Sequence, residues 1–177
     1  MLHFSRSVTI NRPRLDVYQL WRQLDRLPEF MLHLESVNVV SDSRSHWVAK
    51  APAGQRVEWD AEITDDQPGD LIAWRSLEGS DVPNGGSVRF IDAPADRGTE
   101  LHVDLYYEPA GGKAGSTFAK LFGEEPSQQL RDDLRRFKQV METGEVVRSD
   151  GSLEGAGEGA SKERPAQAPK GKVGVRS

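Results

Sequence analysis

The feature that most constrains the fold is a run of six strand-like stretches followed by one long segment with helical periodicity. The stretches are bounded by turn residues, Pro83-Asn84-Gly85-Gly86 among them, and cover about residues 35–42, 45–51, 56–66, 70–78, 86–92 and 99–108. A seventh stretch, residues 3–11, also alternates between apolar and polar side chains and is predicted to be a strand. Short connections between successive strands favour an antiparallel meander, because a parallel crossover needs about a dozen residues or more.

Strict alternation over residues 57–63 shows which side of the predicted sheet is buried. Val57, Trp59, Ala61 and Ile63 share one face, and Glu58, Asp60 and Glu62 share the other. An antiparallel sheet with one buried and one solvated face produces this pattern. The carboxylates are therefore predicted to face solvent and to pair across strands with Arg75 and Arg89, not to form a catalytic or metal-binding group.

Helical periodicity appears at both ends of this run of strands. Pro13 opens a first helix and Asp25 a second, short one. After Gly111-Gly112 a long helix is predicted over about residues 115–143, with Asp132 and Arg136 paired on its polar face. Its apolar stripe consists of Leu130, Leu134, Phe137 and Met141. Burying this stripe against the apolar sheet face gives a two-layer α+β domain.

The composition changes near Gly144. Residues 144–177 contain seven glycines and no aromatic residue, whereas every Trp, Tyr and Phe lies earlier in the chain. Such a segment has too little apolar surface to offset the entropy lost on ordering. We therefore predict a folded domain over residues 1–143 and a flexible glycine-rich tail over residues 144–177.

Charge and composition exclude several classes of protein. The formal net charge is −5, which disfavours a nucleic-acid binder, and the absence of cysteine excludes disulfides and zinc thiolate sites. No apolar run approaches the roughly 18 residues that span a bilayer. His3, His33, His46 and His102 show no metal-binding spacing. A cytoplasmic protein without a metal, cofactor or nucleic-acid partner is expected, for which transient membrane contact and the oligomeric state stay open.

Several segments, in this order, resemble the START-like (SRPBCC) superfamily and, within it, the polyketide cyclase/dehydrase and coenzyme Q-binding branch. The resemblance covers about residues 3–143 and rests on Leu27-Pro28-Glu29-Phe30-Met31, Leu34-Glu35-Ser36-Val37, His46-Trp47-Val48-Ala49-Lys50, residues 57–63, Ile72-Ala73-Trp74-Arg75-Ser76, Gly86-Ser87-Val88-Arg89-Phe90, Gly98-Thr99-Glu100-Leu101 and Leu134-Arg135-Arg136-Phe137-Lys138. It implies a helix-grip fold, in which a seven-stranded antiparallel sheet wraps around a long C-terminal helix.

The helix-grip fold also implies a cavity between the sheet and the C-terminal helix. Residue parity predicts that the cavity binds its ligand through Trp47, Trp59, Trp74, Val88, Phe90, Val103, Leu105 and Tyr107 of the sheet and Leu130, Leu134, Phe137 and Met141 of the helix, with Phe30 and Met31 near the mouth. The alternative is that these side chains pack together and fill the space completely.

Few groups in this inward-facing set could act as an acid or a base. Tyr107 and Ser76 are the candidates, and a buried tyrosine hydroxyl more often satisfies a structural hydrogen bond than acts chemically. The sequence therefore favours noncatalytic binding or carriage of a hydrophobic small molecule, such as a lipid, a quinone or a polyketide-like aromatic. Two alternatives stay open: a polyketide aromatase/cyclase, and an interaction module with a packed interior.

Overall fold

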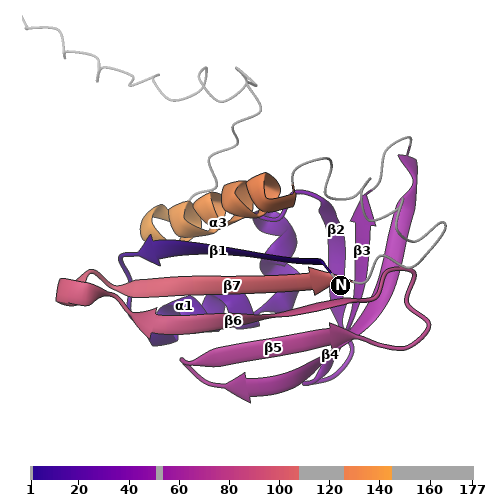
Figure 1. Cartoon of the computed structure of the whole chain (residues 1–177), viewed down its shortest axis with the longest axis horizontal. Helices are drawn as coiled ribbons and strands as arrows, with labels where there is room; N and C mark the ends of the chain where they lie inside the picture. Colours follow the sequence, from indigo (N-terminus) through magenta and orange to yellow (C-terminus); the bar gives the residue numbers. More distant parts are fainter. Residues whose placement is uncertain (1, 51–53, 108–125, 145–177) are drawn as a thin grey trace, which may run out of the picture. The chain divides into compact units, whose positions relative to one another are not determined.

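A computed structural model of the chain describes residues 2–50, 54–107 and 126–144. The predicted tail and residues 115–125 of the predicted long helix lie outside the described residues. The described residues form one sheet with helices packed against it (Figure 1).

The sheet has seven strands in the order β1-β7-β6-β5-β4-β3-β2, and every neighbouring pair is antiparallel. This confirms the predicted meander, to which the N-terminal strand adds beside the last one. Figure 1 shows β2 and β3 running across the direction of β5, β6 and β7, so the sheet is strongly bent. The strands are β1 (Leu2–Ile10), β2 (Leu34–Val39), β3 (Arg44–Lys50), β4 (Arg56–Gln67), β5 (Leu71–Ser76), β6 (Asn84–Asp92) and β7 (Thr99–Tyr107).

Two short helical elements follow β1, as predicted, and a longer helix follows β7. They are the α-helix α1 (Arg14–Arg22), the 3-10 helix η1 (Leu24–Glu29) and the α-helix α3 (Pro126–Thr143), and a single 3-10 turn, η3 (Pro94–Asp96), connects β6 to β7. α3 packs along the edge strand β1, η1 packs against β2 and α1 packs against β6 (Figure 1).

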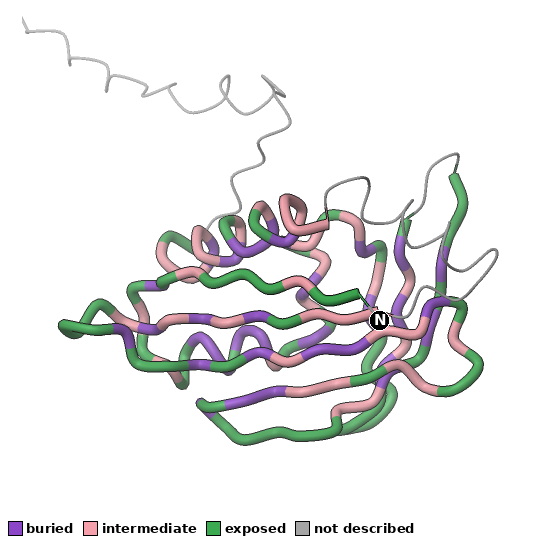
Figure 2. Tube along the Cα trace, viewed as in Figure 1, coloured by how far each residue is buried: buried purple, intermediate pink, exposed green. Residues whose placement is uncertain are grey.

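The burial pattern confirms the alternation predicted for the sheet (Figure 2). On β4, Val57, Trp59 and Ala61 are buried, whereas Glu58 and Asp60 are exposed. On the solvated face, Asp60 lies 2.8 Å from His46 Nδ1 of β3, and Glu62 lies 2.7 Å from Arg75 Nη2 of β5. The predicted pairing is therefore confirmed for Glu62 with Arg75, whereas Asp60 contacts His46 instead and the predicted partner Arg89 forms no ion pair among the described residues.

The helix α3 buries the predicted apolar stripe. Leu130, Leu134 and Phe137 are at most 3% exposed, and Met141 is partly buried against the same core. The predicted pairing of Asp132 with Arg136 was wrong. Arg136 Nη1 instead donates a 3.0 Å hydrogen bond to Asp133 Oδ1, because the Asp133 carboxyl is turned into the protein where the guanidinium can reach it.

The predicted turn at residues 83–86 is also corrected by the structure, because β6 begins at Asn84 and includes both glycines. A Cβ atom on Gly85 would lie 2.3 Å from the Tyr106 hydroxyl oxygen. A Cβ atom on Gly86 would lie 2.4 Å from a backbone oxygen of β7 and 3.0 Å from the Trp74 ring. These glycines are therefore needed for close packing inside a strand, not for a turn.

Three aromatic rings at the centre of the core join α1, η1 and α3. The ring centroids of Phe137 and Phe30 are 4.8 Å apart, and those of Phe137 and Trp21 are 5.1 Å apart. Phe30 and Phe137 are completely buried and Trp21 is 2% exposed. This cluster fixes the position of α3 relative to the N-terminal helical elements, and so defines one end of the space between α3 and the sheet.

Candidate functional site

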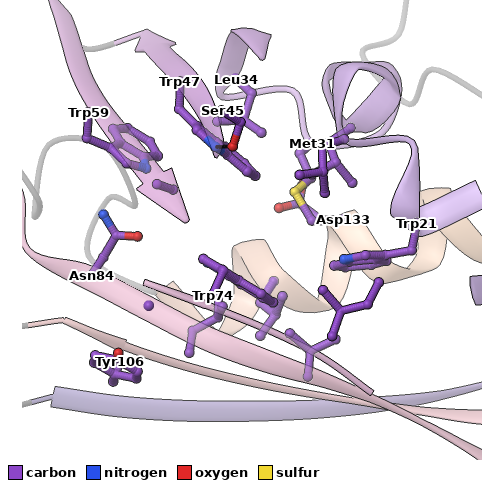
Figure 3. Close-up of a pocket in the computed structure, with 18 of the residues that line it drawn as sticks. Trp21, Met31, Leu34, Ser45, Trp47, Trp59, Trp74, Asn84, Tyr106 and Asp133 are labelled. Carbon is purple, nitrogen blue, oxygen red and sulfur yellow. Dashed lines mark hydrogen bonds between the residues drawn. The ribbon is translucent and has the colours of Figure 1, made fainter. Parts of the chain in front are cut away.

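A cavity lies between the concave sheet face and α3 (Figure 3). The space open to the centres of water-sized molecules is about 90 Å³. That is several times the roughly 10–15 Å³ needed to hold one water molecule, so the side chains do not fill the interior completely. The lining is mainly apolar: Phe4, Trp21, Leu24, Leu27, Met31, Leu34, Trp47, Trp59, Ala61, Ile63, Ile72, Trp74, Val82, Gly85, Val103, Leu105 and Leu130, with His33, Ser45, Glu62, Asn84, Tyr106 and Asp133 as polar members.

The structure brings half of the predicted ligand-binding residues together around this cavity: Met31, Trp47, Trp59, Trp74, Val103, Leu105 and Leu130. The other half lie elsewhere in the described structure: Phe30, Val88, Phe90, Tyr107, Leu134, Phe137 and Met141. Phe30 is fully buried in the aromatic cluster instead of lying at a mouth, and Phe90 packs against the Tyr18 ring at 5.6 Å. Whether any of the fourteen binds a ligand stays a prediction.

Three tryptophans from three neighbouring strands form an aromatic wall of the cavity (Figure 3). The rings of Trp47 and Trp59 are stacked, with centroids 5.9 Å apart and an angle of 18° between their planes. Trp47 Nε1 donates a 2.8 Å hydrogen bond to Ser45 Oγ, which satisfies the indole inside the protein. Trp74 is only partly buried and fits against Gly86, the position where a side chain would collide with its ring. The hydrogen bond of Trp47 and the packing of Trp74 against Gly86 therefore hold these two rings in place.

Two ionisable side chains that the sequence analysis did not place in the interior line the cavity. Asp133 projects from α3 and is 3% exposed, and His33 follows η1 with its side chain 10% exposed. His33 Nδ1 lies 3.7 Å from Asp133 Oδ2, while Asp133 Oδ1 accepts the hydrogen bond from Arg136. The expectation that the inward-facing set lacks acid or base groups beyond Tyr107 and Ser76 was therefore wrong.

Burial changes the protonation of both groups. Loss of solvation raises the pKa of Asp133 to about 8, against the opposing effect of the Arg136 guanidinium, and the neighbouring Asp132 raises it further. Loss of solvation lowers the pKa of His33 to about 4, and the charge of Arg136 lowers it further. At neutral pH the cavity therefore contains a mainly protonated carboxylic acid beside a neutral imidazole.

The position of Asp133 could have been found from the sequence. It lies three residues after Leu130 and four before Phe137, and on a helix both spacings place it beside the apolar stripe. His33 gives no such signal, because it follows a 3-10 helix and lies outside any regular pattern. Only the tertiary structure brings it next to α3.

Neither a metal site nor a membrane-spanning helix is found in the part of the chain that the structure describes. No group of three or more His, Cys, Asp or Glu side chains could hold a metal ion among those residues. Within the same residues, no helix is long and apolar enough to cross a bilayer.

Comparison with known proteins identifies a family and several similar chains. The family model described as "Polyketide cyclase / dehydrase and lipid transport" matches residues 10–135. An uncharacterized 17.2 kDa protein of Streptomyces lincolnensis, from the melC2-rnhH intergenic region, is 30% identical over 141 residues, which are 77% of this chain and 87% of that protein.

Solved structures show the same arrangement of strands and helix. One match is the crystal structure of DR_A0006 from Deinococcus radiodurans, with 46% sequence identity and a TM-score of 0.67. The match covers 81% of this chain and 100% of DR_A0006. The Zhui aromatase/cyclase from Streptomyces sp. R1128 is 17% identical, with a TM-score of 0.60 and coverage of 82% and 99%, a likeness that concerns the fold alone. The described sheet and C-terminal helix form the START-like helix-grip fold.

Proposed function

Because the chain belongs to the polyketide cyclase/dehydrase and lipid transport family, we propose that it binds and carries a hydrophobic small molecule in the cavity between the sheet and α3. A lipid, a quinone or a polyketide-like aromatic has the required chemistry. The proposed carrier is the domain predicted over residues 1–143, and we expect residues 144–177 not to be needed for binding. Release of the ligand unchanged distinguishes this carrier from an enzyme.

The observation that supports this function best is the cavity itself, with the tryptophan wall on one side and Leu130 of α3 on the other. Ligand sites in proteins are concave, mainly apolar and supplied with few polar groups, and this cavity has those properties. An interaction module with a packed interior would have no reason to retain unfilled apolar space, because each void costs packing energy. The cavity therefore favours a ligand over a packed interior.

A polyketide aromatase/cyclase is the second candidate, and Asp133 and His33 are the observation that favours it. A cyclase must hold a reactive chain in a folded shape and needs an acid or base within reach of it. The protonated Asp133 carboxyl and the neutral His33 imidazole both line the cavity. Mass analysis of a ketone ligand recovered after incubation separates the two functions, because a carrier returns it unchanged.

Trp59→Ala is expected to weaken binding of an apolar dye such as N-phenyl-1-naphthylamine while leaving the protein folded. Trp59 forms part of the cavity wall and stacks on Trp47. Its removal should cost about 1–2 kcal/mol of unfolding free energy, less than the 3–5 kcal/mol typical of a fully packed aromatic residue. Dye titration and urea unfolding of the same samples measure both effects.

Phe90→Leu provides the matched control, because Phe90 is a buried aromatic residue of β6 that lies outside the cavity lining. It should lower stability by a similar amount without changing the affinity for the dye. If Phe90→Leu weakened dye binding as much as Trp59→Ala, the loss would reflect general destabilisation and the cavity would not be the dye site. A wild-type protein that binds no apolar dye would contradict the proposed function directly.

A further inference from the structure

Asp133 and His33, with Arg136 bound to Asp133, give the mainly apolar cavity a polar end on the side of α3. Figure 3 shows the Asp133 carboxyl group directed into the space between Met31 and Trp21. Three of the other polar side chains of the lining have partners within the protein, and Asn84 donates a hydrogen bond to the Val82 carbonyl oxygen. Ser45 is bonded to Trp47, and Glu62 is paired with Arg75 on the solvated face.

One oxygen of Asp133 is held by the protein and the other is available to a ligand. Oδ1 accepts the 3.0 Å hydrogen bond from Arg136 Nη1. Oδ2 lies 3.7 Å from His33 Nδ1, which is beyond hydrogen-bonding distance. A ligand that enters the cavity can therefore contact Oδ2 without breaking the contact between Asp133 and Arg136.

We propose that Asp133 is the polar anchor of the cavity, and that its protonated carboxyl donates a hydrogen bond from Oδ2 to a carbonyl oxygen of a hydrophobic ketone or quinone. This inference rests on the proposed binding function and specifies the ligand class. Arg136 strengthens the anchor, because a cation that binds Oδ1 polarises the carboxyl and makes its O–H a better donor.

The charges around Asp133 favour a neutral carbonyl over a charged ligand group. Burial and Asp132 favour the protonated carboxyl, which would give a ligand cation no negative partner at neutral pH. A ligand carboxylate would face the neutral His33 imidazole and no cation in the described lining, because Arg136 is not one of the lining residues. The other titratable groups of the described lining are Glu62, already paired with Arg75, and Tyr106 of β7.

The test compares two probes of nearly the same shape, 2-acetylnaphthalene and 2-isopropenylnaphthalene, in which a C=CH₂ group replaces C=O. Their affinities are measured by displacement of N-phenyl-1-naphthylamine from the full chain. At pH 6.5 the wild type should bind the ketone roughly three- to tenfold more tightly, the range given by one net hydrogen bond. The preference should disappear by pH 9.5, because the ionised carboxylate has no proton to donate.

Variants at two adjacent positions complete the test. Asp133→Asn keeps a side-chain hydrogen-bond donor, the amide N–H, and should therefore retain the preference for the ketone probe at both pH values. Asp133→Leu should bind the two probes equally. Asp132→Asn, a change to a half-buried neighbour on the same helix, should keep the preference at pH 6.5 and lose it at a somewhat lower pH than the wild type does, because Asp132 raises the pKa of Asp133. Retention of the preference in Asp133→Leu, or equal binding of both probes by the wild type, would overturn the anchor and leave the binding function intact. If neither the dye nor either probe bound to the wild type, both the anchor role of Asp133 and the proposed binding function would be overturned.

Discussion

Replacing Phe137 by alanine is expected to lower the free energy of unfolding by about 3–5 kcal/mol, the usual loss for a buried aromatic residue. Phe137 has no exposed surface, and its ring packs between those of Phe30 and Trp21. Removing it leaves a void where α1, η1 and α3 meet, and those elements cannot collapse without moving α3 relative to the sheet. The cavity depends on that position, so dye binding should be lost along with stability.

Urea unfolding followed by circular dichroism measures this loss. Arg131→Ala is the matched control, because Arg131 lies on the exposed side of the same helix and its replacement should change stability by no more than about 0.5 kcal/mol. A loss below about 1 kcal/mol for Phe137→Ala would mean that the aromatic cluster does not hold α3 in place.

Raising the pH from about 6.5 to 8 is expected to lower the free energy of unfolding by about 1–1.5 kcal/mol, at up to roughly 1.4 kcal/mol per pH unit. The folded-state pKa of Asp133 is raised from 3.8 to about 8, so the folded protein retains a proton that the unfolded chain releases. The stability that this proton provides is fully present at low pH and is lost as the pH rises toward 8.

His33 has the opposite effect at lower pH. Its folded-state pKa is lowered from 6.5 to about 4, so the unfolded chain binds a proton that the folded protein does not, and stability rises with pH between these values. The unfolding free energy therefore rises with pH because of His33 and falls because of Asp133 between about pH 4 and 6.5, and the two effects offset each other. Above pH 6.5 the effect of His33 is nearly complete and the decrease due to Asp133 dominates, which is why that window is used.

The Asp133→Asn variant checks this assignment, because an amide does not titrate. Its free energy of unfolding, from urea curves at pH 6.5, 7.2 and 8, should stay nearly constant. Asp132→Asn should still show a decrease, displaced to somewhat lower pH because Asp132 no longer raises the pKa of Asp133. An equal decrease in Asp133→Asn and the wild type would assign the proton to another group and would remove the basis for a neutral acid in the cavity.

The fold could be predicted because its elements follow from local patterns. Alternation over residues 57–63 identified the two faces of β4, and the spacing of Leu130, Leu134 and Phe137 identified the buried side of α3. The start of β6 could not be predicted in the same way. Gly85 and Gly86 have the composition of a turn, but the Tyr106 and Trp74 side chains of neighbouring strands determine their role.

The cavity was harder to predict than the fold. Parity separates the inner face from the outer one, but it does not tell a side chain that borders a void from one that is fully packed. Trp59 and Phe90 both point inward, yet the first lines the cavity and the second packs against Tyr18. His33 reaches the site only because η1 and α3 pack together, and that depends on contacts between residues far apart in the sequence.

Native mass spectrometry of the protein purified from its own host tests the central claim most directly. The cavity predicts an added mass from an apolar small molecule, released unchanged on denaturation. Ala61→Phe fills the cavity from β4 and should abolish this added mass while circular dichroism confirms a folded protein. Repeated absence of a bound molecule from the wild type, or the same added mass in wild type and Ala61→Phe, would contradict the claim that this cavity is a ligand site.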